Sequence, residues 1–484
     1  MSAPTILLSA PYGVAARFLL RTAVVPRLLD AGVKVVVLVP NPDEEYLRAE
    51  FDDPRITLEL LRTGTQPPAD RLWLATTTLR GTVLADGHRN RTIRAKLANA
   101  AAGLAQQGRL GRLAAAALRV TVPAFWRSRT LRRGLLALET RFRSPDPHAD
   151  VFERHRPRLV VTTSPGWFLA DAVVLREARR RGIPSVAAVL GWDNPTSKGY
   201  RGADPETIVA WSQHMADQVA ALHDFPRERV QATGVPHFDL YRRPGQLLDR
   251  ETLFARFGLD PARKLVVFAT STPSGLGDNT AVARSIEEAI ASGTLGDAQL
   301  VVRVHPFYFR TGEDTGIGSL RALAERCEHV TLDVPEILSL RMRSDVPHSD
   351  DVRLGSLLAH CDVLVNVFST TTVEAFLLDR PVVFVGGWQR PDRPGGPDPR
   401  DYAGYTHLRG LIEAGAVRVA ADPAALVEHI RSYLDDPSLE RDLRLRFAQR
   451  EAGPADGHAG DRLADLILAA AGTRAPAPAP SGTV

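Results

Sequence analysis

Four consecutive hydroxyl residues, Ser369 to Thr372, stand in the sequence DVLVNVFSTTTVEAFLLDRPVVFV. The apolar run before them, 363–367, is rich in β-branched residues and is typical of a strand covered on both faces. The run after them, 373–378, has the character of a short helix. Because a helix begins with free N–H groups and a partial positive charge, hydroxyls at this place can help to seat a phosphate. N-capping explains one such hydroxyl, but the whole run beside Glu374 favours a nucleotide site.

A second motif, Arg303-Val-His305-Pro306, follows another apolar run. A histidine at the end of a buried strand can donate a hydrogen bond to a phosphate oxygen at neutral pH. Arg303 lies two positions earlier and is predicted on the same side of the strand. The alternative is a hydrogen-bonded core histidine, but the Arg-x-His-Pro context favours ligand contact.

The acidic residue Glu374 suits a sugar better than a phosphate. A carboxylate is a poor partner for a phosphate, but it accepts hydrogen bonds from both hydroxyls of a ribose. We therefore expect the pyrophosphate near the hydroxyl run and the ribose beside Glu374. The alternative interpretation is a first-turn acid that complements the helix dipole.

Two further loops carry polar residues after apolar runs. Thr270-Ser-Thr-Pro-Ser-Gly-Leu-Gly277 combines hydroxyl donors with glycines that permit a close backbone approach to a phosphate, although neither a Walker A motif nor GxGxxG is present. Gly191-Trp-Asp-Asn-Pro-Thr-Ser-Lys-Gly199 has the composition of an ordinary turn, but its Trp and Lys are less expected there. Asp193 is the candidate general base for an acceptor hydroxyl. His237 and Asp239 are the alternatives.

The elements around these loops alternate between strand-like and helix-like segments, which predicts parallel, doubly wound α/β sheets. A helix is expected between two of the strands, at 168–181. We place a boundary near residue 245 and expect two facing Rossmann-like domains, 1–245 and 246–472, with a disordered Pro/Ala-rich tail at 473–484. The expected strands are 5–9, 34–39, 158–163, 185–190 and 207–211 in the first half, and 265–269, 299–304, 363–367 and 382–385 in the second.

The segment 88–143 differs in charge from the rest of the first half. It contains thirteen basic residues against one acid, Glu139, with Leu and Ala at helical spacing between them. This pattern predicts a basic helical insertion of the kind that suits an anionic lipid surface or a lipid-linked pyrophosphate acceptor. The alternative is a solvated, arginine-rich face. No recognition motif supports nucleic acid as the partner.

The composition fits a cytosolic protein that lies at most on the inner face of a membrane. The 484 residues are 44% hydrophobic, enough for two cores, and the net charge is only +4. The two cysteines exclude a disulfide framework and most cysteine-based metal sites. The N-terminus lacks a basic signal-peptide region, and no uncharged apolar run reaches the length of a spanning helix.

Together these motifs resemble the GT-B superfamily, near the CDP-glycerol glycerophosphotransferase-like and surface-polysaccharide glycosyltransferases. The resemblance rests on Arg-x-His-Pro, on Asp-x-x-Val-x-x-x-Ser-Thr-Thr-x-x-Glu-Ala with Arg-Pro-Val-Val, on the 191–199 loop, and on Thr-Gly-Val-Pro-x-x-Asp at 233–239. It covers about 155–470, and the first 60 residues only by pattern. It implies a donor site in the second domain, with His305 and Ser369 to Thr371 on the phosphates and Glu374 on the ribose.

The sequence departs from glycerophosphotransferases at Val367-Phe-Ser-Thr370, where they carry Asp-Tyr-Ser-Ser, and the Glu374 position resembles sugar-nucleotide users. We therefore expect a glycosyltransferase that moves a sugar from a nucleotide-diphosphate donor to an acceptor hydroxyl, with no cofactor besides that donor. No Asp-x-Asp motif follows a strand, which favours metal-independent transfer. The predicted catalytic residues are Asp193 and His305, and the predicted donor-binding residues are Thr270, Ser271, Arg303, His305, Ser369, Thr370, Thr371, Thr372 and Glu374.

Three other functions fit the same pattern. A polyol-phosphate transferase of the CDP-glycerol type would share the fold and the histidine but attack phosphorus. A non-hydrolysing UDP-sugar 2-epimerase would use the fold without a second substrate. A basic scaffold without enzymatic activity would bind no nucleotide at all.

Overall fold

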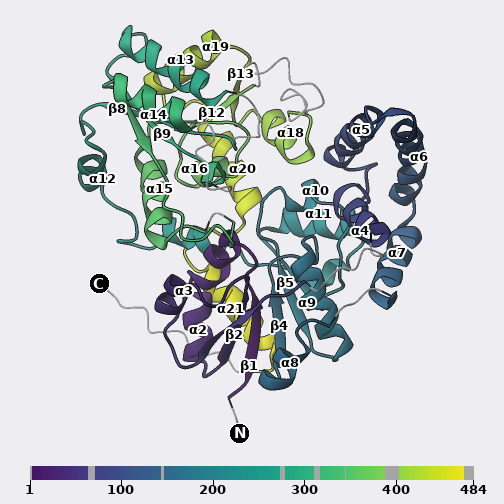
Figure 1. Ribbon diagram of the computed structural model, residues 1–484. Coiled ribbons are helices and arrows are strands. Elements are labelled where there is room, and N and C mark those ends of the chain that lie inside the picture. The colour runs from purple at the N-terminus through teal and green to yellow at the C-terminus, as the bar shows by residue number, and fades with distance from the viewer. Residues whose placement is uncertain are drawn as a thin grey trace.

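The computed structural model describes residues 3–63, 71–142, 146–272, 278–309, 317–343, 345–386 and 403–473. They form two parallel sheets, one in each half of the chain, with helices on both faces (Figure 1). The predicted class, two facing Rossmann-like domains, is confirmed. The predicted tail at 473–484 lies outside the described residues, except for Thr473.

The first sheet has seven strands in the order β3-β2-β1-β4-β5-β6-β7. The predicted strands are all present, and β3 and β7 at the two edges are additional. The central strands bury every residue of 159–162 and 185–188, as expected where helices cover both faces. The bounds are β1 Thr5–Ser9, β2 Lys34–Val39, β3 Ile56–Leu60, β4 Leu159–Thr162, β5 Ser185–Ala188, β6 Thr207–Ala210 and β7 Val230–Ala232.

Short and medium helices connect these strands. The predicted helix 168–181 is α9, and its observed bounds are Leu169–Arg180. The segment between β1 and β2 contains three short helices, and the middle one is a π-helix. The bounds are α1 Gly13–Ala15, η1 Ala16–Leu20, α2 Val24–Asp30, α3 Glu45–Glu50, α8 Ala149–His155, α10 Asn194–Ser197, α11 Gln213–His223, η3 Arg227–Arg229 and η4 Pro236–Tyr241.

The second sheet has six strands in the order β10-β9-β8-β11-β12-β13. The chain therefore leaves β8 towards one edge and returns beside it as β11, so the sheet has a switch point between β8 and β11. Ligands in open α/β sheets bind outside the carboxyl ends of the strands at such a point. The bounds are β8 Lys264–Ala269, β9 Ala298–Arg303, β10 Val330–Asp333, β11 Val363–Asn366, β12 Val382–Val385 and β13 Arg418–Ala420.

The helices around the second sheet include two that return to the first. Helix α20 packs on α16 and α11, and α21 packs on α2 and η4, so the last helix, which the sequence assigned to the second domain, lies on the first sheet (Figure 1). The bounds are α12 Arg250–Phe257, α13 Asn279–Ala291, η5 Pro306–Phe309, α14 Ile317–Arg326, α15 His348–His360, α16 Thr371–Leu377, α18 Thr406–Glu413, α19 Pro423–Asp435, α20 Arg441–Ala452 and α21 Ala459–Ala470.

The basic segment is helical, as predicted. It consists of α5 Arg91–Ala105, α6 Gly108–Arg127 and α7 Arg129–Phe142, preceded by α4 Arg71–Val83. Trp126 anchors it, because the indole N–H donates to the Val83 carbonyl at 2.7 Å. The one acid of the segment, Glu139, is fully buried and accepts hydrogen bonds from Arg80 at 2.9 Å and Arg176 at 2.7 Å.

Candidate functional site

A cavity of about 460 Å³ lies between the two halves and collects most of the predicted site residues. Its wall in the second half comes from the loops after β9, β8 and β11, which are neighbours in the sheet. Its wall in the first half comes from the loop after β5 and from α5. The predicted residues on this surface are Asp193, Thr270, Ser271, His305, Ser369 and Thr370.

His305 presents a hydrogen-bond donor to this cavity. The Phe307 backbone N–H donates to His305 Nδ1 at 3.1 Å, so Nδ1 is an acceptor and the proton of the neutral ring is on Nε2. Burial, and secondly the charge of Arg303, lower the pKa of His305 to about 4. The ring is therefore neutral at physiological pH and offers Nε2–H to a ligand without requiring protonation.

Thr270 and the backbone of His305 are held together at the ends of β8 and β9. The His305 N–H donates to Thr270 Oγ1 at 2.9 Å, which leaves the hydroxyl proton of Thr270 available as a donor. Ser271 is more engaged, because its N–H and its hydroxyl both donate to Asn279 Oδ1, at 3.1 and 3.3 Å. The glycines predicted to approach a phosphate, Gly275 and Gly277, lie outside the described residues.

The hydroxyl run is divided between two tasks. Ser369 and Thr370 line the cavity, and Ser369 Oγ accepts the Thr371 N–H at 3.3 Å. The Asn366 amide donates instead to Thr371 at 3.3 Å and to Thr372 at 2.9 Å. Thr372 is fully buried. Two of the four hydroxyls therefore line the cavity, whereas the other two accept the Asn366 amide and join the end of β11 to the start of α16. Contact of the four hydroxyls with a phosphate stays a prediction.

The turn into the hydroxyl run is strained. Phe368 has φ 52°, in the left-handed region that a bulky side chain rarely adopts. Its ring packs edge-on against Phe384 with centroids 5.0 Å apart. Backbone strain of this kind is held in place by surrounding packing and gathers at ligand sites.

On the opposite wall, Asp193 is surrounded by positive and donating groups. Burial alone would raise the pKa of Asp193, but Lys198, His407 and the hydrogen bond from Ser197 together lower it. The carboxylate is therefore ionised at neutral pH and can accept a proton. Gly199 ends this loop against α4, where a Cβ would lie 2.1 Å from the Arg80 carbonyl oxygen, so a larger residue would displace Lys198 and its neighbours.

Three basic residues of the cavity were not predicted as site residues. Lys96 reaches the cavity from α5, where its ammonium donates to the Ser197 carbonyl. Lys198 lies over the Phe168 ring at 5.3 Å, and His407 comes from α18, with Nδ1 2.9 Å from the Thr196 hydroxyl. Burial, and then Lys198, lower the pKa of Lys96 to about 8. Burial lowers the pKa of His407 to about 4.

Arg303 and Glu374 lie outside the cavity surface. Arg303 is buried, and its guanidinium donates to Asp333 at 2.7 Å and to Asp350 at 3.1 Å. Strand β9 ends at Arg303, and a 3-10 helix begins at Pro306. The alternation of side chains along the strand therefore stops before His305, and it does not place the two residues on the same side. Glu374 is also buried, and it accepts a hydrogen bond from the Tyr241 hydroxyl. Both residues therefore bind protein groups, and their predicted contact with the donor stays a prediction.

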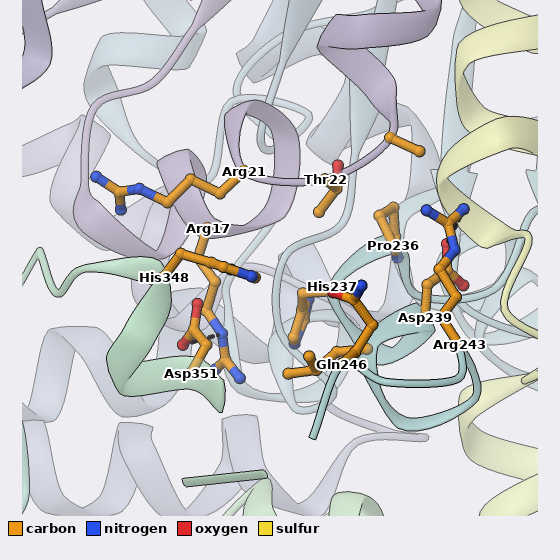
Figure 2. Close-up of a pocket in the computed structure, with 12 residues that line it drawn as sticks. Arg17, Arg21, Thr22, Pro236, His237, Asp239, Arg243, Gln246, His348 and Asp351 are labelled. Carbon is orange, nitrogen blue, oxygen red and sulfur yellow. Dashed lines mark ion pairs between the residues drawn. The ribbon is translucent and has the colours of Figure 1, made fainter. Parts of the chain in front are cut away.

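The alternative bases, His237 and Asp239, line a different cavity of about 150 Å³ at the hinge between the halves (Figure 2). Asp239 accepts the backbone N–H groups of Ala459 and Gly460 at 2.9 and 2.8 Å. It therefore holds the start of α21. Neither residue shares the cavity of His305.

Within the described ranges, no three His, Cys, Asp or Glu side chains converge as a metal site. Among the same residues, no helix combines the length and hydropathy needed to span a bilayer.

Comparison with known proteins supports the predicted class. No family model matches the chain. Over 318 residues it is 28% identical to D-inositol 3-phosphate glycosyltransferase 1 of Catenulispora acidiphila, covering 61% of this chain and 69% of that protein.

Two solved structures share the fold at low identity. MnaA of S. aureus, solved with UDP, has a TM-score of 0.53 and 12% identity over 98% of this chain and 99% of its own. The wall teichoic acid polymerase TagF, soaked with CDPG, has a TM-score of 0.50 and 9% identity over 98% of this chain and 90% of its own. The chain therefore has the two-domain GT-B fold and resembles the GT-B glycosyltransferases, as its motifs predicted.

Proposed function

We propose that this protein is a GT-B glycosyltransferase that moves a sugar from a nucleotide-diphosphate donor to an acceptor hydroxyl without a metal ion. One observation carries the proposal: a single cavity joins neutral hydrogen-bond donors on one wall to an ionised carboxylate between two lysines on the other. The sequence relative, a D-inositol 3-phosphate glycosyltransferase, supports sugar transfer as the reaction.

The diphosphate of the donor would lie along the loops after β8, β9 and β11. His305 Nε2–H and the hydroxyls of Thr270, Ser369 and Thr370 are donors suited to phosphate oxygens. Lys96 lies across the cavity and adds the positive charge that a leaving diphosphate needs. Solved proteins of this fold hold UDP or CDPG, which supports a nucleotide in this place.

Asp193 would act as the general base. As the acceptor oxygen forms its bond to the anomeric carbon, its proton passes to the carboxylate, and the bond from that carbon to the diphosphate oxygen breaks. Lys198 and Ser197 keep Asp193 ionised before the reaction. In this assignment the first half supplies the base and the acceptor wall, and the second half supplies the donor wall.

A thermal-shift panel with UDP, GDP, TDP, CDP and CMP tests the donor site, because a ligand that binds only the folded state raises the melting temperature. We expect a nucleoside diphosphate to stabilise the protein and the double variant His305→Ala, Ser369→Ala to lose the shift. The matched control is His348→Ala, Ser349→Ala, an exposed pair outside this cavity. If both variants kept the shift, or if both lost it, the placement of the donor in this cavity would be contradicted.

The products of donor turnover separate the related activities. A glycosyltransferase releases the nucleoside diphosphate, whereas a CDP-glycerol-type transferase attacks phosphorus and releases the monophosphate. A 2-epimerase interconverts two UDP-sugars with no second substrate. Release of CMP, or interconversion of free UDP-sugars, would replace the proposed reaction by one of these.

A further inference from the structure

The outward face of α6 combines features that do not suit contact with water alone. Leu110, Leu113 and Val120 are 81%, 68% and 76% exposed, the three highest values among the large hydrophobic side chains that the structure describes. Leu131 and Leu138 on α7 are exposed as well. Five of the nine exposed large hydrophobic residues therefore belong to these two neighbouring helices.

The exposed apolar residues of α6 form a stripe along one side of the helix. The stripe has spacings of three and four residues, and all of its members are exposed: Leu110, Leu113, Ala117, Val120 and Ala124. A second apolar stripe on the other side, which includes Val122 and Trp126, packs into the protein core. A helix with apolar residues on both sides is expected to be covered on both sides.

Positive charge borders the exposed stripe. Arg109, Arg112, Arg119 and Arg127 of α6 are exposed, and no described residue forms a hydrogen bond or an ion pair with their side chains. The segment's one acid, Glu139, is buried between Arg80 and Arg176, so the described surface of α5 to α7 carries no acidic side chain. Arginines beside an apolar stripe fit a bilayer surface, where the apolar side chains enter the acyl region and the cations remain at the phosphates.

We propose that the outer faces of α6 and α7 dock on an anionic lipid bilayer. Figure 1 shows α6 at the outer edge of the molecule, with α5 between it and the second half. Helix α5 packs on α6 and carries Lys96 into the cavity between the halves, so docking would place that cavity close to the lipid surface. The proposal rests on exposure and charge, and it is independent of the reaction proposed above.

Vesicle sedimentation with the full chain tests the surface. Vesicles of phosphatidylcholine mixed with phosphatidylglycerol should carry the protein down, those of phosphatidylcholine alone should not, and added salt should weaken the binding. The variant Arg109→Glu, Arg112→Glu, Arg119→Glu should bind at least about 100-fold more weakly, because each of the three arginines near an anionic surface contributes about a fivefold factor. Its control, Arg256→Glu, Arg431→Glu, Arg446→Glu, has the same charge change on exposed positions of α12, α19 and α20 and should bind better than the α6 variant.

A second variant tests the apolar stripe without changing the charge. Leu110→Ser, Leu113→Ser, Val120→Ser should weaken binding to the mixed vesicles, whereas Leu340→Ser, an exposed leucine elsewhere, should not. Unchanged melting temperatures show that the variants are folded. Wild-type binding by the serine variant, or equal loss in the two arginine variants, would overturn the proposal. The proposal would also be overturned if the wild-type protein bound duplex RNA or DNA but did not bind the mixed vesicles under the same conditions. That result would indicate a nucleic-acid partner.

Discussion

The cavity of His305 and the hinge cavity both lie between the halves of the molecule, and each is lined by histidines, acids and cations. In the hinge cavity the two arginines from η1 and the segment after it are paired with protein carboxylates: Arg17 pairs with Asp351 of the same cavity at 2.8 Å, and Arg21 pairs with Asp345 at 2.6 Å and Glu50 at 2.7 Å. In the larger cavity, His305 keeps Nε2–H, and Thr270 keeps its hydroxyl proton, available for a ligand.

This contrast separates the proposed donor site from an interdomain contact. A buried ion pair whose partners are both protein groups holds two segments together. A hydrogen-bond donor that is held in position but donates to no protein atom can instead bind a substrate. The same distinction divides Asp193 from Asp239, because the second carboxylate accepts two backbone N–H groups of α21. Residue type alone therefore does not mark the site.

The largest expected effect concerns the two aspartates. Asp193→Asn removes the proposed base and should lower kcat about 100-fold to 10⁴-fold, the usual contribution of general base catalysis, while nucleotide binding is kept. Asp239→Asn should leave kcat close to that of wild type and lower the melting temperature, because it weakens the hold on α21. Turnover with the best donor and thermal melting of both variants check this. Equal losses of kcat would contradict the assignment of the base.

The next effect concerns the hinge. Arg21→Ala should lower the free energy of unfolding by about 3 kcal/mol, since it leaves the carboxylate of Asp345, which is fully buried, without its cation. Denaturant titration measures this loss. Arg48→Ala is the control, because the Arg48–Asp43 pair is exposed and such pairs contribute about 0 to 1 kcal/mol. A similar small loss for Arg21→Ala would show that the hinge cavity is not held by its ion pairs.

The sequence predicted the fold and the donor wall better than the groups opposite it. Apolar runs and their loops determine where parallel strands end, so Thr270, His305 and Ser369 could be assigned to one sheet edge before the structure was known. Lys96 could not be assigned to the cavity in this way. Its helix belongs to a segment where basic residues are common, and only tertiary packing determines which of them reaches the cavity. His407 follows residues outside the described ranges, and no strand or motif marks it.

The two predicted donor-binding residues that lie away from the cavity surface have a similar explanation. Arg303 and Glu374 are of the right types for phosphate and ribose, but the sequence does not show that Asp333, Asp350 and Tyr241 already occupy them. Their partners come from β10, α15 and the hinge, which are too far away in the sequence for a local pattern to predict the contact. The burial of a polar side chain can be predicted from its strand, whereas the identity of its partner is known only from the three-dimensional structure.

A smaller effect is expected from pH. The pKa of Lys96 is about 8 and that of His305 about 4, so between these values the lysine is charged and the histidine neutral. Affinity for an intact nucleotide-sugar, whose doubly esterified diphosphate does not titrate between these values, should be level in that range and fall by about tenfold as pH rises through 8 and Lys96 loses its proton, a change of about 1.4 kcal/mol. Calorimetric titration across pH measures it. Lys96→Arg should bind without the fall, because arginine stays charged, and a fall of the same size in that variant would assign it to another group.

The smallest effect tests the comparison within the hydroxyl run itself. Thr370 lines the cavity, whereas the hydroxyl of Thr372 accepts the Asn366 amide at 2.9 Å. Thr370→Val should therefore weaken nucleotide binding by about fivefold and leave the melting temperature unchanged, since one hydrogen bond contributes about 1 kcal/mol. Thr372→Val should do the reverse, lowering the free energy of unfolding by about 1 kcal/mol with unchanged affinity. If both variants lost affinity equally, Thr372 would belong to the donor site as well, and the contrast between ligand-facing and protein-facing groups would fail at this turn.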